Sequence, residues 1–172
     1  MARAVLITGG NIGDTASLMG RAARLISEHG CVITGLSAVH TSKPWGDGKG
    51  EDDSPAQVFL NQVVEVETAL DPFALLNATQ EIERELGRNK DKSAQGAARS
   101  YASRTMDIDI LFYGDLVLRS EVLTIPHPLL HEREFVLGPL TEVLPNLRHP
   151  ICGLSSAEML GRLHDSKKKD YE

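Results

Sequence analysis

The sequence predicts an α+β sandwich, in which helices pack on a mostly antiparallel sheet. Three observations lead to this fold class. The 172 residues fit one domain of ordinary size. The patterned segments follow the order strand, helix, strand, strand, helix, strand. No repeat or low-complexity linker divides the chain. We therefore expect residues 1–172 to form a single domain.

The first half of the chain is expected to supply three strands and a helix. Residues 2–8 predict a strand, and the two glycines that follow predict a turn. A helix should run from about residue 15 to residue 29, where Gly30 ends it. Residues 32–40 and 58–67 have the composition of strands. Between them we expect a long loop.

The second half is expected to add a helix, an acidic strand and short elements. Residues 72–86 predict a helix with a first-turn proline, ended by the glycine that follows. After the acidic strand, a Gly-Asp turn predicts a hairpin into residues 116–118. The prolines between 126 and 145 predict short turns. A last helix should span residues 155–164, with residues 167–169 as a solvated tail.

Composition and charge limit the class of function. The net charge of −6 argues against a wholly basic surface, so we expect no nucleic-acid partner. No apolar run approaches the length of a membrane span, and no signal peptide is evident, so we expect a cytoplasmic protein with no membrane partner. Cys31 and Cys152 lack the spacing of metal or disulfide motifs, which fits a reducing compartment. We expect a monomer.

The acidic strand carries the strongest chemical signal. Asp107 and Asp109 alternate with apolar residues, so a strand would place both carboxylates on one face. Neighbouring carboxylates repel each other unless a cation lies between them. Mg²⁺ commonly takes one or two carboxylates together with substrate phosphates, and Arg104 could hold a phosphate. The alternative is an ordinary half-buried strand with a solvated acidic face.

A polar segment, residues 89–103, precedes this strand and predicts a mobile loop. It contains Lys90 and Arg99 and is flanked by Arg88 and Arg104. Such cations could fold over a polyphosphate and neutralise its charge during transfer. The alternative is a flexible, solvated cluster of charges.

Two pairs of residues could recognise a heterocycle or a nucleotide. Phe59 and Asn61 share one face of a predicted strand, and together offer a ring for stacking and an amide for pairing. Gln80 and Glu83 share one face of a predicted helix and could bind a ribose or a base. The alternatives are a core phenylalanine beside an edge asparagine, and a solvated helix face.

The segment Ile125-Pro126-His127-Pro128 is expected to be rigid, because residues before prolines favour extended conformations. It would present His127 in a fixed direction, or else form a structural turn with an exposed histidine. We do not expect zinc binding, because His127 should not be helical. Arg133 and Phe135 follow at alternate positions and, if extended, would place a cation and a second ring on one face.

In this order and spacing, the motifs resemble those of 6-hydroxymethyl-7,8-dihydropterin pyrophosphokinases, a family of folate synthesis. The resemblance runs from Gly9 to about Pro145, and residues 104–111 and 125–137 are its most specific parts. It implies a ferredoxin-like α/β sandwich with a mostly antiparallel sheet and helices on both faces. It also implies ATP as co-substrate, a reduced pterin as acceptor and two Mg²⁺ ions. The β,γ-pyrophosphoryl group of ATP would move to the hydroxymethyl oxygen of the pterin, with release of AMP.

The resemblance also implies a role for individual residues. Asp107 and Asp109 would bind the two Mg²⁺ ions. The residues that would hold the pterin, by stacking or at its polar edge, are Ser42, Lys43, Trp45, Phe59, Asn61 and Phe135. Those that would contact the nucleotide are Gln80, Glu83, Ile110, Thr124, His127 and Arg133. The closing loop and phosphate clamp would use Arg88, Lys90, Tyr101 and Arg104, of which Lys90 and Arg104 would be catalytic together with the aspartates.

The chain departs from the family pattern mainly near this loop. Lys90 stands where some members have arginine, which removes a bidentate fork. Tyr101-Ala102-Ser103 stands where many members have Trp-Gly-Pro, and the loop is longer than in compact members. Val122 replaces a basic residue of some members. These differences bear on loop geometry and closure, and not on the metal pair.

Two other classes of function remain as alternatives. Nucleotidyltransferases also combine a glycine turn with an Asp-x-Asp strand, but in them the two features lie close in sequence, whereas here Gly10 and Asp107 lie far apart. Transfer of AMP, rather than its release, would identify that class. A ligand-binding module with a ferredoxin-like core would show no Mg²⁺-dependent ATP turnover with pterin present.

Overall fold

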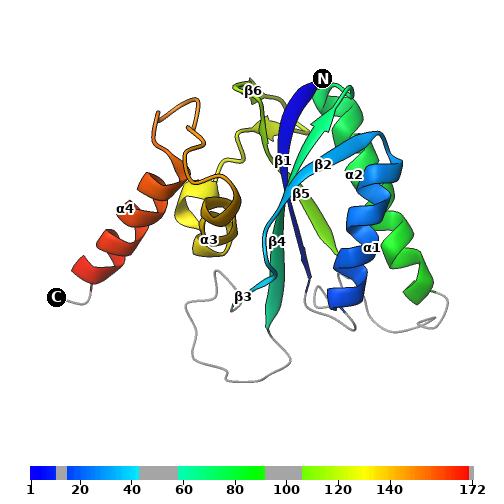
Figure 1. The fold of residues 1–172 in the computed structure, drawn as a ribbon, viewed down its shortest axis with the longest axis horizontal. Coiled ribbons are helices and arrows are strands. Elements are labelled where there is room, and N and C mark those ends of the chain that lie inside the picture. The colour runs from blue at the N-terminus through cyan, green and yellow to red at the C-terminus, as the bar shows by residue number, and fades with distance from the viewer. Residues whose placement is uncertain (11–14, 43–57, 92–105, 171–172) are drawn as a thin grey trace.

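The computed structural model describes residues 1–10, 15–42, 58–91 and 106–170. Figure 1 shows a sheet with helices on both sides. In chain order, the elements are β1 (Ala2–Gly10), α1 (Thr15–Glu28), β2 (Cys31–Leu36), β3 (His40–Ser42), β4 (Phe59–Thr68), α2 (Pro72–Asp91), β5 (Asp107–Tyr113), β6 (Leu118–Arg119), β7 (Thr124–Ile125), η3 (Leu130–Glu132), α3 (Glu134–Val143) and α4 (Ser156–Lys169). None of the helices described in these segments is long and apolar enough to cross a membrane.

The main sheet has the strand order β2-β4-β1-β5, and β3 also pairs with β4. Every pairing within it is antiparallel. Strand β1 lies between β4 and β5, and its register places Gly9 opposite Asn61 on one side and opposite Asp107 on the other. An amide and a carboxylate that are distant in sequence therefore meet at one end of the sheet.

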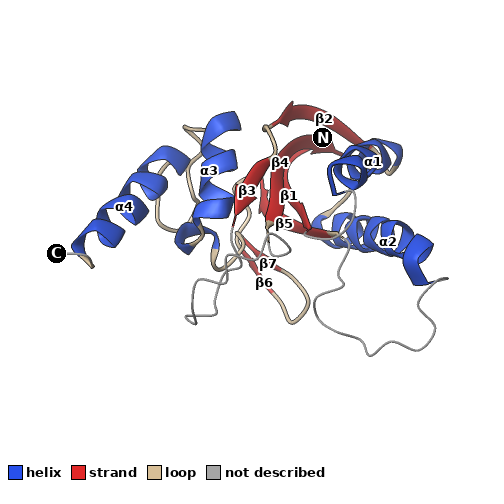
Figure 2. Ribbon diagram, turned by 90° about the horizontal axis from the view of Figure 1, so that it is seen from below, coloured by secondary structure: helices blue, strands red, loops and turns tan. Residues whose placement is uncertain are grey.

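Helices cover both faces of the sheet (Figures 1 and 2). Alternate residues of β1 explain this arrangement, because Ala4 and Leu6 join the core beneath α1 and α2, whereas Val5 and Ile7 join the core beneath α3. All four are buried, as expected for a strand with a hydrophobic layer on each side. The predicted α+β sandwich with a mostly antiparallel sheet is confirmed.

Several predicted boundaries in the first half were wrong. The two glycines after residue 8 belong to β1, because β1 continues in register with β4. The predicted strand 32–40 is two strands, β2 and β3, separated by residues 37–39. Helix α2 does not end at Leu86 but continues through Gly87 to Asp91. Asn89 and Lys90 therefore lie in a helix and not in the predicted loop, and Arg88, which was expected to flank that loop, is helical too.

The second half also differs from the prediction. Residues 116–118 do not form a hairpin with β5; instead β6 pairs with β7. The turn between them is closed by Ser120, whose backbone N–H donates to the Leu123 oxygen (3.0 Å) and whose hydroxyl accepts from the Leu123 N–H (3.0 Å). The Ile125–Pro126 peptide bond is cis.

Near the C-terminus, helix α3 was not predicted at all, and helix α4 was predicted too short. Helix α3 was not expected because Pro139 lies inside it, and an interior proline removes a backbone donor. Helix α4 continues to Lys169, so Lys167, Lys168 and Lys169 form its last turn, where cations complement the helix dipole, rather than a tail. Lys167 also donates to Glu134 at the start of α3 (2.6 Å), which ties the two helices together.

Candidate active site

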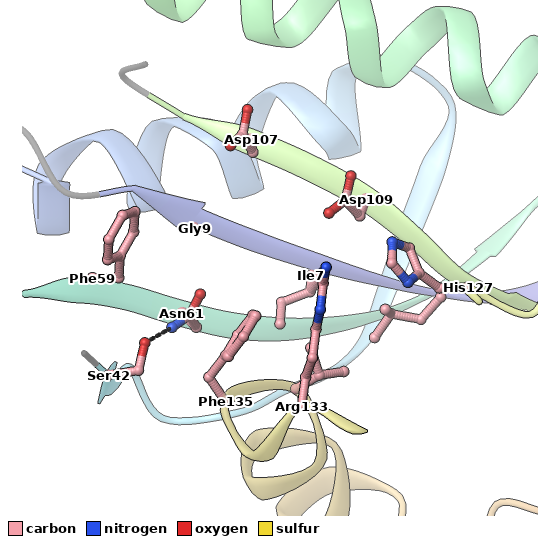
Figure 3. A pocket seen from close by; sticks show the side chains of 12 residues that line it. Ile7, Gly9, Ser42, Phe59, Asn61, Asp107, Asp109, His127, Arg133 and Phe135 are labelled. Carbon is pink, nitrogen blue, oxygen red and sulfur yellow. Dashed lines mark hydrogen bonds between the residues drawn. The ribbon is translucent and has the colours of Figure 1, made fainter. Parts of the chain in front are cut away.

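The main candidate site is a pocket of about 260 Å³ on the α3 side of the sheet (Figure 3). It brings together side chains from β3, β4, β5, α3 and the segment before η3. The predicted site residues that line it are Ser42, Phe59, Asn61, Asp107, Asp109, His127, Arg133 and Phe135. The structure thus gathers residues that the sequence placed in five separate segments.

Asp107 and Asp109 lie at alternate positions at the start of β5, and both line the pocket. Both residues are exposed, so their carboxylates can reach a ligand. No group of three or more potential metal-binding side chains occurs among the described residues. A pair of carboxylates fits Mg²⁺ nevertheless, because this ion usually completes its shell with water and substrate phosphates.

Asn61 forms the polar floor of the pocket on β4. It is 6% exposed, and its Nδ2 donates to Ser42 Oγ on β3 (2.8 Å; Figure 3). This bond fixes the amide orientation, which leaves Oδ1 as an acceptor. A Cβ atom at Gly9 would come within 2.7 Å of that Oδ1 and 3.2 Å of the Leu60 carbonyl oxygen. Glycine therefore leaves room for the asparagine to keep its position.

Two aromatic rings line the pocket from different elements. Phe59 begins β4, and Phe135 lies in the first turn of α3; both are half-buried. In the view of Figure 3, Asn61 lies between these rings. A flat heterocycle could therefore stack on a ring while the amide pairs with its edge.

Arg133 and Phe135 are not both extended, so the condition under which they would share a strand face is not met. Arg133 is the N-cap residue of α3, with φ −114° and ψ 105°, and Phe135 is helical. Both still line the pocket, and the guanidinium carbon lies 5.6 Å from the centre of the Phe135 ring. This distance fits a cation–π interaction, so each of the two side chains helps to hold the other in position.

His127 is held in place by its backbone. Its N–H donates to the Leu111 oxygen (3.0 Å), and its Nδ1 accepts from the Leu129 N–H (3.4 Å). Burial lowers the pKa of His127; the Asp109 carboxylate opposes this shift, and Arg133 adds to it. The ring is therefore neutral near pH 7, and the Nδ1 contact favours the tautomer with a proton on Nε2.

A second hollow, of about 280 Å³, adjoins the pocket at Asp109 and His127. Ile110 and Thr124, two of the predicted nucleotide residues, line it. Val122 also lines it and is 70% exposed. Neither of the two rings, Phe59 and Phe135, lines this hollow. It has the position expected for a second, adjacent ligand.

The structure does not bring every predicted residue into these hollows. Gln80 is exposed on α2, and Glu83 accepts a hydrogen bond from the Ile108 N–H (2.7 Å), which fixes the start of β5. Lys43, Trp45, Tyr101 and Arg104 lie outside the described residues. Arg88 and Lys90 belong to the last turn of α2.

Some lining residues were not expected from the sequence. Ile7, Leu111 and Val136 form the apolar wall of the pocket, and Gly9 leaves space for Asn61. Their positions depend on strand register and on helix α3. The glycine pair was visible in the sequence, but its partner across the sheet was not.

The fold and the pocket define a class of protein: an α+β sandwich with two carboxylates in a ring-and-amide pocket, one of which, Asp109, also lines a second hollow. The family model described as "7,8-dihydro-6-hydroxymethylpterin-pyrophosphokinase (HPPK)" matches residues 5–145. The chain belongs to this family.

Curated relatives agree with this family. A 2-amino-4-hydroxy-6-hydroxymethyldihydropteridine pyrophosphokinase of Bacillus subtilis (strain 168) is 38% identical over 141 residues, which cover 81% of this chain and 77% of the relative. One of Aquifex aeolicus (strain VF5) is 38% identical over 152 residues, which cover 88% and 86%. The "Folic acid synthesis protein fol1" of Pneumocystis carinii is 39% identical over 163 residues, but these cover only 20% of that longer protein.

Solved structures support the fold. The HPPK-DHPS of Plasmodium falciparum, wild type with pteroate, matches 99% of this chain with a TM-score of 0.74 and 16% identity. The wild type described without pteroate gives a TM-score of 0.71 and 18% identity. This chain covers 46% of each of those chains. At such low identity, the likeness concerns the fold alone.

Proposed function

We propose that this protein transfers the β,γ-pyrophosphoryl group of ATP to 6-hydroxymethyl-7,8-dihydropterin, giving AMP and the pterin diphosphate, in folate biosynthesis. One observation carries the proposal: in a chain of this family, the acidic pair lies in the same pocket as two aromatic rings and a fixed amide. The pterin hydroxymethyl oxygen forms a bond to the β-phosphorus and loses its proton, and the bond from that phosphorus to the α,β-bridging oxygen breaks. AMP leaves with that oxygen.

The pterin lies between the rings of Phe59 and Phe135. The amide of Asn61, oriented by Ser42, pairs with the polar edge of the heterocycle. In this pose the hydroxymethyl group faces the acidic pair. Lys43 and Trp45 belong to the same proposed pterin site through their backbone. Stacking and pairing together hold the pterin hydroxymethyl group in position. Positioning of the reactants is a main contribution of the protein to phosphoryl transfer.

The triphosphate lies over Asp107 and Asp109, and the nucleoside occupies the adjoining hollow near Ile110 and Thr124. The two carboxylates would hold two Mg²⁺ ions. Bound there, the ions would supply positive charge that stabilises the phosphates during transfer. Neutral His127, with its proton on Nε2, donates a hydrogen bond to the nucleotide.

We propose that cationic side chains neutralise the charge of the transferred group. Arg133 lies beside Phe135, at the boundary between the two substrates. We assign the phosphate clamp to Arg88, Lys90, Tyr101 and Arg104, with Gln80 and Glu83 on the nucleoside side. Such a clamp acts mainly on the charge that develops as AMP departs.

The protein is proposed to act as a cytoplasmic monomer in which residues 1–172 form one domain.

The test is a chromatographic assay of nucleotides after incubation with ATP, Mg²⁺ and the reduced pterin. The proposal predicts AMP in equal amount to the pterin diphosphate, with both products absent when pterin or Mg²⁺ is omitted. A pterin–AMP conjugate with free pyrophosphate would identify a nucleotidyltransferase. No nucleotide turnover at all would favour a binding module.

A further inference from the structure

We propose that Glu142, which lies outside the pocket, is a positioning residue that sets the distance between the two walls of the pterin site. This inference rests on the proposed function and adds a residue to it. The two walls come from different layers of the fold. Ser42, Phe59 and Asn61 belong to the sheet, whereas Phe135 belongs to α3. The distance between these two walls, which we call the width of the slot, therefore depends on how α3 is held against β3.

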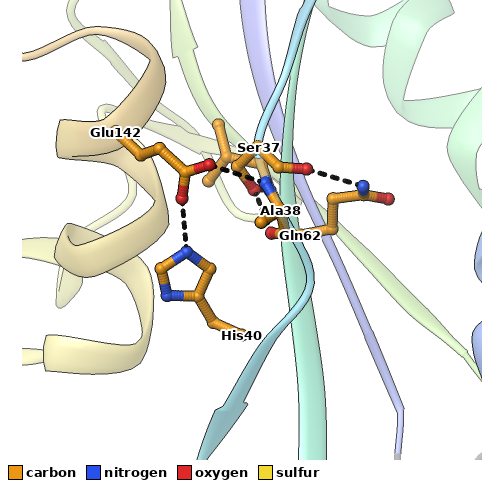
Figure 4. Close-up of polar contacts among 6 residues, drawn as sticks. Ser37, Ala38, His40, Gln62 and Glu142 are labelled. Atoms are coloured by element: carbon orange, nitrogen blue, oxygen red, sulfur yellow. Dashed lines mark hydrogen bonds and ion pairs between the residues drawn. The ribbon is translucent and has the colours of Figure 1, made fainter.

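Glu142 makes that connection directly (Figure 4). Its Oε1 accepts from the Ala38 N–H (2.8 Å), and its Oε2 lies 2.5 Å from Nε2 of His40. Both partners are on the connection from β2 to β3 or on β3 itself. The hydrogen bond from Ala38 and, after it, the bond with His40 lower the pKa of Glu142, so the carboxylate is ionised near neutral pH.

The spacing along each element links this contact to the pocket. On α3, Glu142 follows Phe135 by about two helical turns and shares its side of the helix. On β3, His40 and Ser42 are alternate residues and share a side of the strand. The contact between Glu142 and His40 thus joins the element that carries one ring to the element that orients Asn61.

The strand side of the contact is itself anchored. Ser37 donates its N–H to the Val63 oxygen (3.0 Å), accepts from the Val63 N–H at Oγ (2.9 Å) and accepts from Gln62 Nε2 at its carbonyl oxygen (2.8 Å; Figure 4). The connection 37–39 is therefore fixed to β4. Glu142 therefore connects α3 to a segment that is itself bound to the sheet, and not to a free loop.

Glu142 and His40 are both partly exposed, with side chains 42% and 36% accessible. Exposed ion pairs contribute little to global stability, because water and salt screen them. The contact is therefore expected to matter for the geometry of the slot more than for folding. This difference separates a positioning role from a merely structural one.

The experiment measures AMP formation by wild type, Glu142→Ala and Glu142→Gln, with pterin and ATP varied separately. For Glu142→Ala we expect the KM for pterin to rise on the order of tenfold, since small misplacements are costly in such sites. The KM for ATP and the kcat should change less than twofold. Glu142→Gln should restore the pterin KM, because its amide oxygen can accept from the Ala38 N–H while its NH₂ group can donate to the His40 ring.

Glu158→Ala is the matched control, since Glu158 is an exposed helical glutamate that pairs with Arg148 (4.0 Å) away from the pocket. It should leave the pterin KM unchanged. In a double-mutant cycle, adding His40→Ala to Glu142→Ala should not add its full effect. Fluorescence titration of the pterin with a non-hydrolysable ATP analogue gives a readout without turnover.

The outcomes are distinguishable. An active wild type with an unchanged pterin KM in Glu142→Ala would overturn this inference and leave the proposed function in place. An equal loss for both substrates, accompanied by a lowered melting temperature, would show a structural role and would also overturn it. A wild type that forms no AMP would overturn the proposed function, and this inference with it.

Discussion

The substitution Phe135→Ala tests the ring pocket most specifically. It removes the stacking surface supplied by α3 but leaves Phe59, Asn61 and Ser42 in place. Loss of one aromatic stacking partner costs about 1–3 kcal/mol, by analogy with bases stacked on aromatic side chains. That corresponds to a pterin Kd about 5- to 150-fold weaker. The effect on ATP should be smaller, because the cation–π contact of Arg133 with this ring (5.6 Å) is worth only about 0.5–1 kcal/mol at exposed sites.

The assay is calorimetric titration of the pterin in the presence of a non-hydrolysable ATP analogue, followed by titration of the analogue alone. Phe73→Ala is the matched control, because Phe73 is 44% exposed on α2 and does not line the pocket. It should leave both affinities unchanged. The reasoning is refuted if Phe135→Ala binds the pterin within twofold of wild type, or if it weakens the analogue as strongly as the pterin.

Three further predictions concern the metal pair, the pocket floor and pH. Asp107→Asn and Asp109→Asn should each lower kcat by about 10²-fold or more while circular dichroism stays unchanged, because they remove charge at the transferred group; near-normal turnover would refute the metal assignment. Gly9→Ala should raise the pterin KM with little change in the ATP KM, because the new Cβ would lie 2.7 Å from Asn61 Oδ1 and displace the amide; unchanged kinetics would show that the amide is not used. Burial and, to a smaller extent, His131 lower the pKa of His149 in the folded protein below 6.5. As the pH falls, His149 therefore takes up a proton in the unfolded chain before it does so in the folded protein. The free energy of unfolding should thus decrease as the pH falls below about 6.5. Urea midpoints should fall between pH 7.5 and 5.5 in wild type and less so in His149→Asn, whose amide oxygen can still accept the Ile151 and Cys152 N–H groups; an equal fall in both would assign the loss to other groups.

The sequence predicted the layers of the fold because hydrophobic alternation is a local signal. The strand containing Asp107 and Asp109 shows the point, since period two alone places both carboxylates on one face, and both line the pocket. The pairing of Gly9 with Asn61 and Asp107 could not be predicted in this way, because register depends on contacts between distant segments.

The errors have identifiable physical causes. Helix α3 was missed because Pro139 argued against a helix, yet the burial of Val136, Leu137 and Leu140 stabilises it against the sheet. Because α3 was missed, the helical position of Phe135 was not considered. Gly87 was taken as a helix end, but a glycine only weakens a helix, and α2 continues past it.

The contact between Glu142 and His40 was also invisible in the sequence. Neither residue belongs to a motif, and they lie on elements whose packing only the tertiary structure defines. Positioning residues of this kind act through geometry, so a single sequence carries no pattern for them. The residues proposed to touch ligands, in contrast, had chemical types and spacings that pointed to such a use.

Phosphorus NMR of the reaction product would show directly which group is transferred. After incubation of the wild-type protein with ATP, Mg²⁺ and 6-hydroxymethyl-7,8-dihydropterin, we expect a pterin that carries two coupled phosphorus signals, together with AMP. Both signals must derive from the β- and γ-positions of the same ATP. A pterin with a single phosphorus and ADP as the other product, or a pterin joined to the α-phosphorus, would contradict the account.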